Sequence, residues 1–187
     1  MKFKKLLIVI LLLGGIGYLA FSMIIDNTKA QSPEGEVNFQ KENLRVDISY
    51  NRPYKKDRLI FGGLVPYNKV WRTGANEATT FATSRDILID GSLLKAGKYT
   101  LWTIPKENSW KIIFNDRMYA WGIDLSSNEA ARNPENDVLI IERPVEKPNK
   151  TIEQFTIYFE KDKYLNEMVL TWDDVKIKVP FKEKDRH

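Results

Sequence analysis

The chain has 187 residues, 29 of them Lys or Arg and 25 Asp or Glu, with no cysteine and one histidine, His187, at the end. Disulfides and thiol catalysis are therefore excluded, and histidine-based catalysis or metal binding is not expected from a fraying terminus. Beyond residue 30 the basic and acidic residues alternate without a basic block, so we expect no nucleic-acid partner. We also expect no cofactor and no metal ion.

Residues 1–30 are predicted to be a membrane-targeting segment. Lysines near the start precede an uncharged run from Leu6 to Ile25, which at about 1.5 Å per residue can span a hydrocarbon core of about 30 Å. The run fits an uncleaved transmembrane anchor, while Thr28-Lys29-Ala30 offers a cleavage site for a signal peptide, so both interpretations stay open. In either case the positive-inside rule places the following domain outside the cytoplasm: single-pass at the cell membrane, or secreted or periplasmic if cleaved.

A polar linker is expected at residues 31–36, one domain at residues 37–181 and a polar tail at residues 182–187. Within the domain, apolar and polar residues alternate with period two, which predicts half-buried strands. The longer strands are expected at 44–51, 110–115, 154–160, 168–172 and 175–181, and the shorter ones at 79–84, 87–90, 98–104 and 137–143. Asp173-Asp174 predicts a hairpin turn, and the capping-box spacing of Ser126 and Glu129 predicts a short helix at 126–132. The sequence therefore predicts an all-β domain, a single antiparallel β-sandwich or open barrel, after an N-terminal hydrophobic helix.

The segment from Tyr50 to Pro53, the run from Ile60 to Tyr67 and the run from Val70 to Thr79 resemble the bacterial family called domain of unknown function 2911. The resemblance implies a secreted or envelope-associated β domain, and it implies no reaction. Three positions depart from the family's pattern. Asp57 and Asn68 stand where glycine is expected, and Ile140 stands where a basic residue is expected. Asp and Asn tolerate positive φ better than most residues, so both could still serve turns.

The turn from Trp71 to Glu77 is the candidate ligand-binding segment. Arg72 could clamp an anionic group, Asn76 could donate hydrogen bonds, and Glu77 could act as an acid or base. Alternatively, Arg72 and Glu77 form a structural ion pair. Asn115 and Trp121 complete the candidate set. Trp121, beside a glycine in a predicted loop, is expected to be the exposed member of the five tryptophans, and the other four are expected in the core.

No nucleophile elbow, phosphate-binding loop or dinucleotide fingerprint occurs, so we expect no catalytic residue. The leading interpretation is an envelope module that binds a small polar ligand, a glycan or a partner protein. One alternative is a glycoside-type hydrolase that uses Glu77 with a second carboxylate such as Asp116 or Asp124. Another alternative is a structural scaffold protein.

Overall fold

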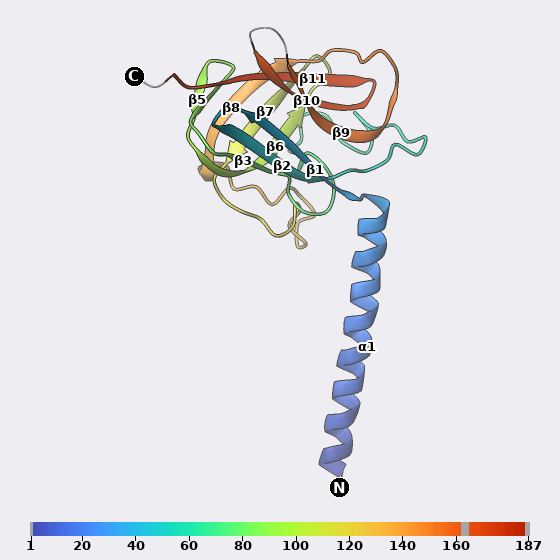
Figure 1. Ribbon diagram of the computed structural model, residues 1–187. Coiled ribbons are helices and arrows are strands. Elements are labelled where there is room, and N and C mark those ends of the chain that lie inside the picture. Colours follow the sequence, from blue (N-terminus) through green and yellow to red (C-terminus); the bar gives the residue numbers. More distant parts are fainter. Residues whose placement is uncertain (1, 162–164, 186–187) are drawn as a thin grey trace.

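The protein is described by a computed structural model for residues 2–161 and 165–185, so the last two residues of the expected tail lie outside the described part. A long N-terminal helix leads into a domain of two antiparallel β-sheets (Figure 1). This arrangement confirms the predicted all-β fold as a sandwich of two separate sheets rather than a barrel.

One sheet has six strands in the order β1-β2-β3-β6-β7-β8. Its strands are β1 (Glu34–Lys41), β2 (Leu44–Asn51), β3 (Thr80–Thr83), β6 (Gly97–Pro105), β7 (Ser109–Asn115) and β8 (Asp137–Pro144), with a 3₁₀ turn η1 (Pro134–Asn136) before β8. The other sheet has five strands in the order β5-β4-β11-β10-β9. Its strands are β4 (Ile87–Ile89), β5 (Ser92–Leu94), β9 (Ile152–Lys161), β10 (Asn166–Asp173) and β11 (Val175–Glu183).

Apolar residues on the inward phase of the strands fill the space between the sheets. The predicted hairpin is present, because Trp172 pairs with Val175 across the Asp173-Asp174 turn, and Asp173 takes φ +54°. The tryptophans at 71, 102, 110 and 172 are buried, whereas Trp121 is half-buried. Four tryptophans are therefore core residues, as predicted.

Helix α1 (Lys2–Gln31) is long and apolar enough to cross a membrane, as either a signal or an anchor would be. Its leucines and isoleucines from Leu6 to Ile24 are exposed instead of packing on the domain. The helix continues to Gln31 and β1 begins at Glu34, so the connection is shorter than the expected linker at 31–36. The buried Ser32 and the carbonyl of Pro33, which accepts the N–H of Arg52 at 2.9 Å, tie this connection to the domain.

Two further expectations differ from the structure. Residues 126–132 form no helix: the Asp124 carboxylate accepts the N–H groups of Ser126 and Ser127, and a bridge between Ile123 and Ala130 closes the loop. A side-chain turn of this kind competes with helix formation. The β1 strand, Glu34–Lys41, was not expected, because only Val37 and Phe39 among its residues are of the β-branched or aromatic types that favour strands, but it pairs with β2 along its whole length.

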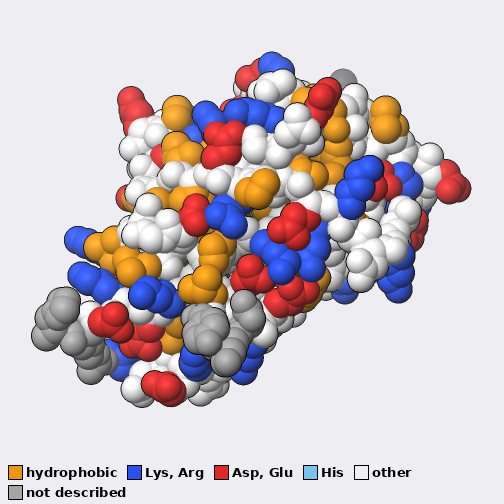
Figure 2. Space-filling view, turned by 90° about the horizontal axis from the view of Figure 1, so that it is seen from above, with side chains coloured by type: hydrophobic (Ala, Val, Ile, Leu, Met, Phe, Trp, Pro, Cys, Tyr) orange, Lys and Arg blue, Asp and Glu red, His pale blue; other side chains and the backbone are white. Residues whose placement is uncertain are grey.

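A long loop projects on the side of the domain that faces α1, and the opposite face carries mixed charges. The yellow-brown loop 116–133 projects from the side at which α1 leaves the domain (Figure 1). On the face away from α1, basic and acidic side chains are interspersed over the surface (Figure 2). The alternation of charge in the sequence therefore appears on that face as a surface on which both signs are mixed.

Candidate functional site

Two long connections carry the residues that the sequence analysis singled out. Residues 52–79 join β2 to β3, and residues 116–133 lead from β7 to η1. Loops of this length in compact domains are uncommon and are usually functional. The two loops are in contact, because the N–H of Gly122 donates to the carbonyl of Asn76 at 2.9 Å. The candidate site lies where they meet.

Trp71 anchors the first loop to the core. Its backbone forms an antiparallel bridge with Thr103 of β6, with N···O distances of 2.7 and 3.0 Å. Its indole N–H donates to the Gly74 carbonyl at 2.9 Å, and its ring packs among Phe61, Trp110, Phe155 and Trp172. Trp71 therefore fixes the position of the turn that follows it.

The turn after Trp71 depends on unusual backbone conformations. Thr73 and Asn76 take φ +57° and +54°, and Gly74 takes φ +150°. A Cβ at Gly74 would lie 2.7 Å from the carbonyl oxygen of Asn51, which only glycine avoids. The Thr79 hydroxyl closes the turn by donating to the Thr73 carbonyl at 2.6 Å. The turn is thus held from both ends.

Glu77 faces helix α1. Its Oε1 lies 2.7 Å from Nζ of Lys29, and its Oε2 accepts the Asn51 amide N–H at 2.9 Å. Partial burial by itself raises the pKa of Glu77, but the hydrogen bonds from Lys29 and Asn51 and the charge of Lys29 bring the pKa below its ordinary value. Glu77 therefore joins the turn to α1 as an ionised carboxylate, and the considered pair with Arg72 does not form.

Glu77→Gln is expected to lower the thermal midpoint of unfolding near neutral pH and to lose this effect in acid. A carboxyl whose pKa is depressed by folding stabilises the fold above its unfolded pKa, about 4.3 for glutamate. That stabilisation is lost as the pH falls through the lower, folded pKa. Circular-dichroism melts of the full chain should therefore give midpoints that differ near neutrality and converge in acid.

The exposed Glu36 provides the matched control, since it forms no ion pair within the described residues. Glu36→Gln should shift the midpoint little. A Glu77→Gln effect of equal size at neutral and acid pH would contradict a role for the carboxylate charge.

Arg72 lies across the second loop without an anionic partner. A Cβ added to Gly122 would lie 2.1 Å from Cδ of Arg72, so the glycine makes room for this side chain. Nε of Arg72 is buried and has no hydrogen-bond partner, and the side chain forms no ion pair with any described residue. Burial lowers the pKa of Arg72 below its ordinary value, yet a guanidinium group remains protonated in proteins. Arg72 is therefore a partly buried cation with unused donors.

Asn76 also carries a buried donor without a hydrogen-bond partner among the described residues. Its side chain is only 3% exposed, and its Nδ2 group has no partner among the described residues. Four buried side-chain nitrogens in the described part of the chain lack a partner, and three of them, in Arg72, Asn76 and Arg132, belong to residues that line two neighbouring clefts. Because buried polar groups are normally hydrogen-bonded, this clustering requires an explanation.

The first cleft, here called the Arg72 cleft, has a volume of about 380 Å³ and lies between the end of α1 and the first loop. Three of the residues that line it are cations, Lys56, Arg58 and Arg72, and none of its described lining residues is acidic. None of the three cations forms an ion pair with a described residue. The other lining residues on which the argument depends are Thr28, Gln31, Ser32, Trp71, Asn76 and Trp172.

The second cleft, here called the outer cleft, has a volume of about 580 Å³ and lies between the two loops. It shares Leu64, Val65, Trp71 and Arg72 with the Arg72 cleft. Its other side is formed by residues 123–132, among which Arg132 is paired with Asp137 at the start of β8. Arg72 thus lines both clefts.

The family profile described as "Protein of unknown function (DUF2911)" matches residues 32–181, which include both loops and all eleven strands except the last two residues of β11. The chain belongs to the DUF2911 family. No curated protein and no solved structure matches the chain. Membership in DUF2911 therefore defines the domain and supplies no ligand or reaction.

Two departures from the DUF2911 pattern are explained by the backbone. Asp57 and Asn68, which stand where glycine is expected, take φ +55° and +61°. Both residues tolerate the left-handed region better than most, as expected from their short polar side chains. Ile140, the third departure, is 51% exposed on β8 and lines neither cleft.

Three candidates from the sequence are not in the Arg72 cleft. Glu77 binds α1 as described above. Asn115 is fully buried, and its amide group donates to the Asn133 carbonyl at 2.8 Å and to Asp137 at 2.9 Å, so it holds the base of the second loop. Trp121 is half-buried in that loop and lines neither cleft. The structure therefore brings together Trp71, Arg72 and Asn76 from the predicted set.

The contributions of α1, Lys56 and Arg58 to the Arg72 cleft were not predicted from the sequence. The adjacent lysines Lys55 and Lys56 were the only local sign of a cationic site there. The residues that surround Lys56 in the fold could not be predicted from this pair. Thr28, Gln31 and Ser32 were missed because the helix was expected to end before them.

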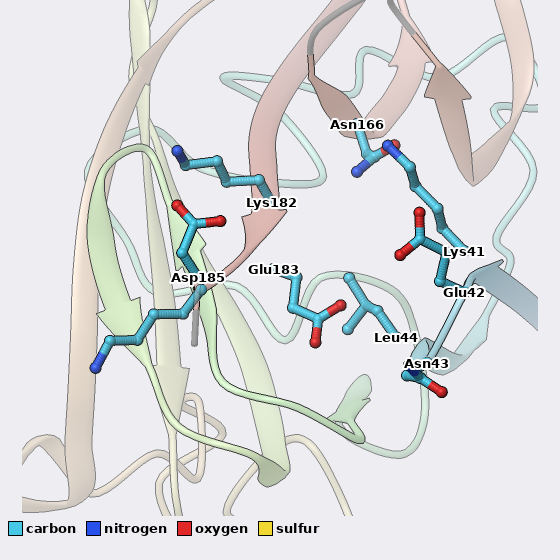
Figure 3. Close-up of a pocket in the computed structure, with 9 residues that line it drawn as sticks. Lys41, Glu42, Asn43, Leu44, Asn166, Lys182, Glu183 and Asp185 are labelled. Carbon is cyan, nitrogen blue, oxygen red and sulfur yellow. The ribbon is translucent and has the colours of Figure 1, made fainter. Parts of the chain in front are cut away.

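Other cavities have a different character. The pocket lined by Lys41, Glu42, Asn166, Lys182 and Glu183 lies at the ends of β1 and β2 that are remote from α1, and cations and carboxylates alternate around it (Figure 3). Within residues 2–161 and 165–185, no three Asp, Glu or His side chains group as a metal site.

Proposed function

We propose that this DUF2911 protein is a membrane-tethered module that binds a small anionic ligand in the Arg72 cleft, outside the cytoplasm. The observation that carries the proposal is the pair of buried nitrogens without partners, Nε of Arg72 and Nδ2 of Asn76, in a cleft lined by three cations and no described acidic residue.

The energetics favour a ligand as the missing partner. A buried polar group without a hydrogen bond costs about 1–3 kcal/mol in proteins. Guanidinium groups bind carboxylates and phosphates through two parallel hydrogen bonds, and Arg72 has donors to spare. An anion in the cleft would pair with the guanidinium group of Arg72 and would compensate the charges of Lys56 and Arg58.

The N-terminal segment supports the proposed location. The uncharged run from Leu6 to Ile25 is helical and does not pack on the domain, which supports a membrane span. The lysines before the run favour an orientation with the domain outside the cytoplasm. The helix contributes directly to the cleft through Thr28 and Gln31, so an uncleaved anchor gives the more complete site.

The observations do not favour the hydrolase alternative. Both carboxylate oxygens of Glu77 are bound by Lys29 and Asn51, so neither is free for a substrate, and its lowered pKa does not suit the general-acid role. The Asp124 carboxylate is occupied by Ser126 and Ser127.

Arg72→Gln is expected to weaken anion binding by about tenfold or more, because a hydrogen bond to a charged group contributes about 1.5–3 kcal/mol. The full chain in phosphatidylcholine nanodiscs would be titrated with inorganic phosphate and with citrate, and binding followed by calorimetry. Arg45→Gln is the matched control, because Arg45 is an exposed arginine paired with Asp47 at the opposite end of β2.

Saturable binding that Arg45→Gln preserves and Arg72→Gln weakens supports the proposal. Binding that is unchanged in Arg72→Gln, or no binding of either anion, contradicts it and favours the scaffold alternative.

A further inference from the structure

The Arg72 cleft lies at the height at which a bilayer presents its headgroups when α1 spans the membrane. Thr28 is three residues beyond Ile25, the end of the apolar run, which is about 4.5 Å along a helix. The headgroup layer on each side of a bilayer is about 5–8 Å thick. Thr28 and Gln31 line the cleft, so one wall of the site stands inside or immediately above this layer.

The second loop reaches toward the same side. Loop 116–133 projects from the end of the domain at which α1 leaves (Figure 1). Leu125 in this loop is 84% exposed and Met118 is 44% exposed. Large exposed apolar side chains beside a membrane span are suited to the boundary between headgroups and acyl chains.

We propose that the ligand of the Arg72 cleft is the headgroup of an anionic phospholipid of the phosphatidylglycerol type. This inference rests on the proposed function and names the source of its anion. The cleft offers cations at Lys56, Arg58 and Arg72 to a phosphate. A choline or ethanolamine group would find no carboxylate among the described lining residues, so the site favours headgroups that carry no cation of their own.

The outer cleft could accommodate the glycerol backbone and the first acyl-chain atoms of such a lipid. It adjoins the Arg72 cleft through Leu64, Val65 and Trp71. The rest of its lining is mixed, with apolar side chains such as Val70 and Ile123 beside the charged Lys69, Glu129 and Arg132. A lipid whose phosphate contacts Arg72 would therefore meet apolar surface on the other side of the same residue.

Native mass spectrometry of the full chain tests this inference. The wild type, Arg72→Gln and Arg45→Gln would be released from phosphatidylcholine bilayers that contain phosphatidylglycerol. We expect the wild type and Arg45→Gln to retain one phosphatidylglycerol that Arg72→Gln loses. The variant Lys56→Gln changes an exposed side chain that forms no ion pair with a described residue, so it should leave folding intact, and it is expected to retain less phosphatidylglycerol than the wild type.

Equal retention of phosphatidylglycerol by wild type and Arg72→Gln, or equal retention of phosphatidylcholine and phosphatidylglycerol by the wild type, would overturn the lipid assignment. The phosphate titration in pure phosphatidylcholine nanodiscs separates the two proposals. Arg72-dependent phosphate binding together with equal lipid retention would overturn the lipid source and leave the anion site standing, with a soluble anion as its ligand. Loss of both signals would overturn both proposals.

Discussion

Trp71→Ala should lower the free energy of unfolding of the domain by about 3–5 kcal/mol, as expected for truncation of a large buried aromatic residue. Its ring is 8% exposed, and the ring centroids of Phe155 and Trp110 lie 5.0 and 5.8 Å away. The change also removes the indole hydrogen bond to Gly74 that supports the Arg72 turn. Denaturant unfolding of the full chain, followed by far-UV circular dichroism, measures the loss.

Trp121→Ala is the matched control, because Trp121 is half-buried in the second loop and packs against no aromatic ring among the described residues. It should cost much less than Trp71→Ala. Equal losses for the two variants would show that Trp71 is not the anchor of the first loop.

Arg72→Met should raise the free energy of unfolding by about 1–3 kcal/mol in the absence of ligand, which is the cost of a buried polar group without a partner. Methionine keeps much of the side-chain length against Gly122 and removes the buried Nε and the charge. Replacement of a buried charge by a well-packed apolar side chain is often stabilising, and binding sites commonly carry a cost of this kind.

Arg52→Met should have the opposite effect. Arg52 donates to the Phe155 carbonyl at 3.4 Å and to the Thr156 hydroxyl at 3.2 Å, so its loss removes satisfied hydrogen bonds between the sheets. Thermal melts of both variants in the same nanodiscs give the comparison. If Arg72→Met proves as destabilising as Arg52→Met, Arg72 is a structural residue and the anion site loses its basis.

The parts of the fold that follow local physical rules could be predicted from the sequence. Strands such as β2 and β11 alternate apolar and polar residues because one side of each faces the core, and this alternation is visible in the sequence. The β10–β11 hairpin was predicted because two alternating strands flank Asp173-Asp174, and in the structure Asp173 takes the left-handed conformation that the turn requires.

Elements stabilised by tertiary pairing could not be predicted. β1 exists because β2 offers a complete ladder to it, and only Phe39 of its residues is buried. At residues 126–132 the hydrogen bonds to Asp124 and the bridge between Ile123 and Ala130 replace the expected helix.

The candidate site was predicted in part for the same reason. The type of chemistry in the Trp71–Glu77 turn could be recognised from residue types, since arginine and asparagine are donors wherever they lie. Their partners depend on distant segments. Glu77 forms its ion pair with Lys29 of α1, which is remote from it in the sequence, so Arg72 has no acidic partner among the described residues. No spacing in the sequence indicates this pairing.

The continuation of α1 to Gln31 gives a protease cut after Ala30 an effect beyond release from the membrane. The cut would remove Lys29, the cation bound by Glu77, and Thr28, part of one wall of the Arg72 cleft. A shed domain would therefore carry an uncompensated carboxylate beside a wider and more hydrated opening. The tethered and shed forms would differ in what they recognise as well as in where they are found.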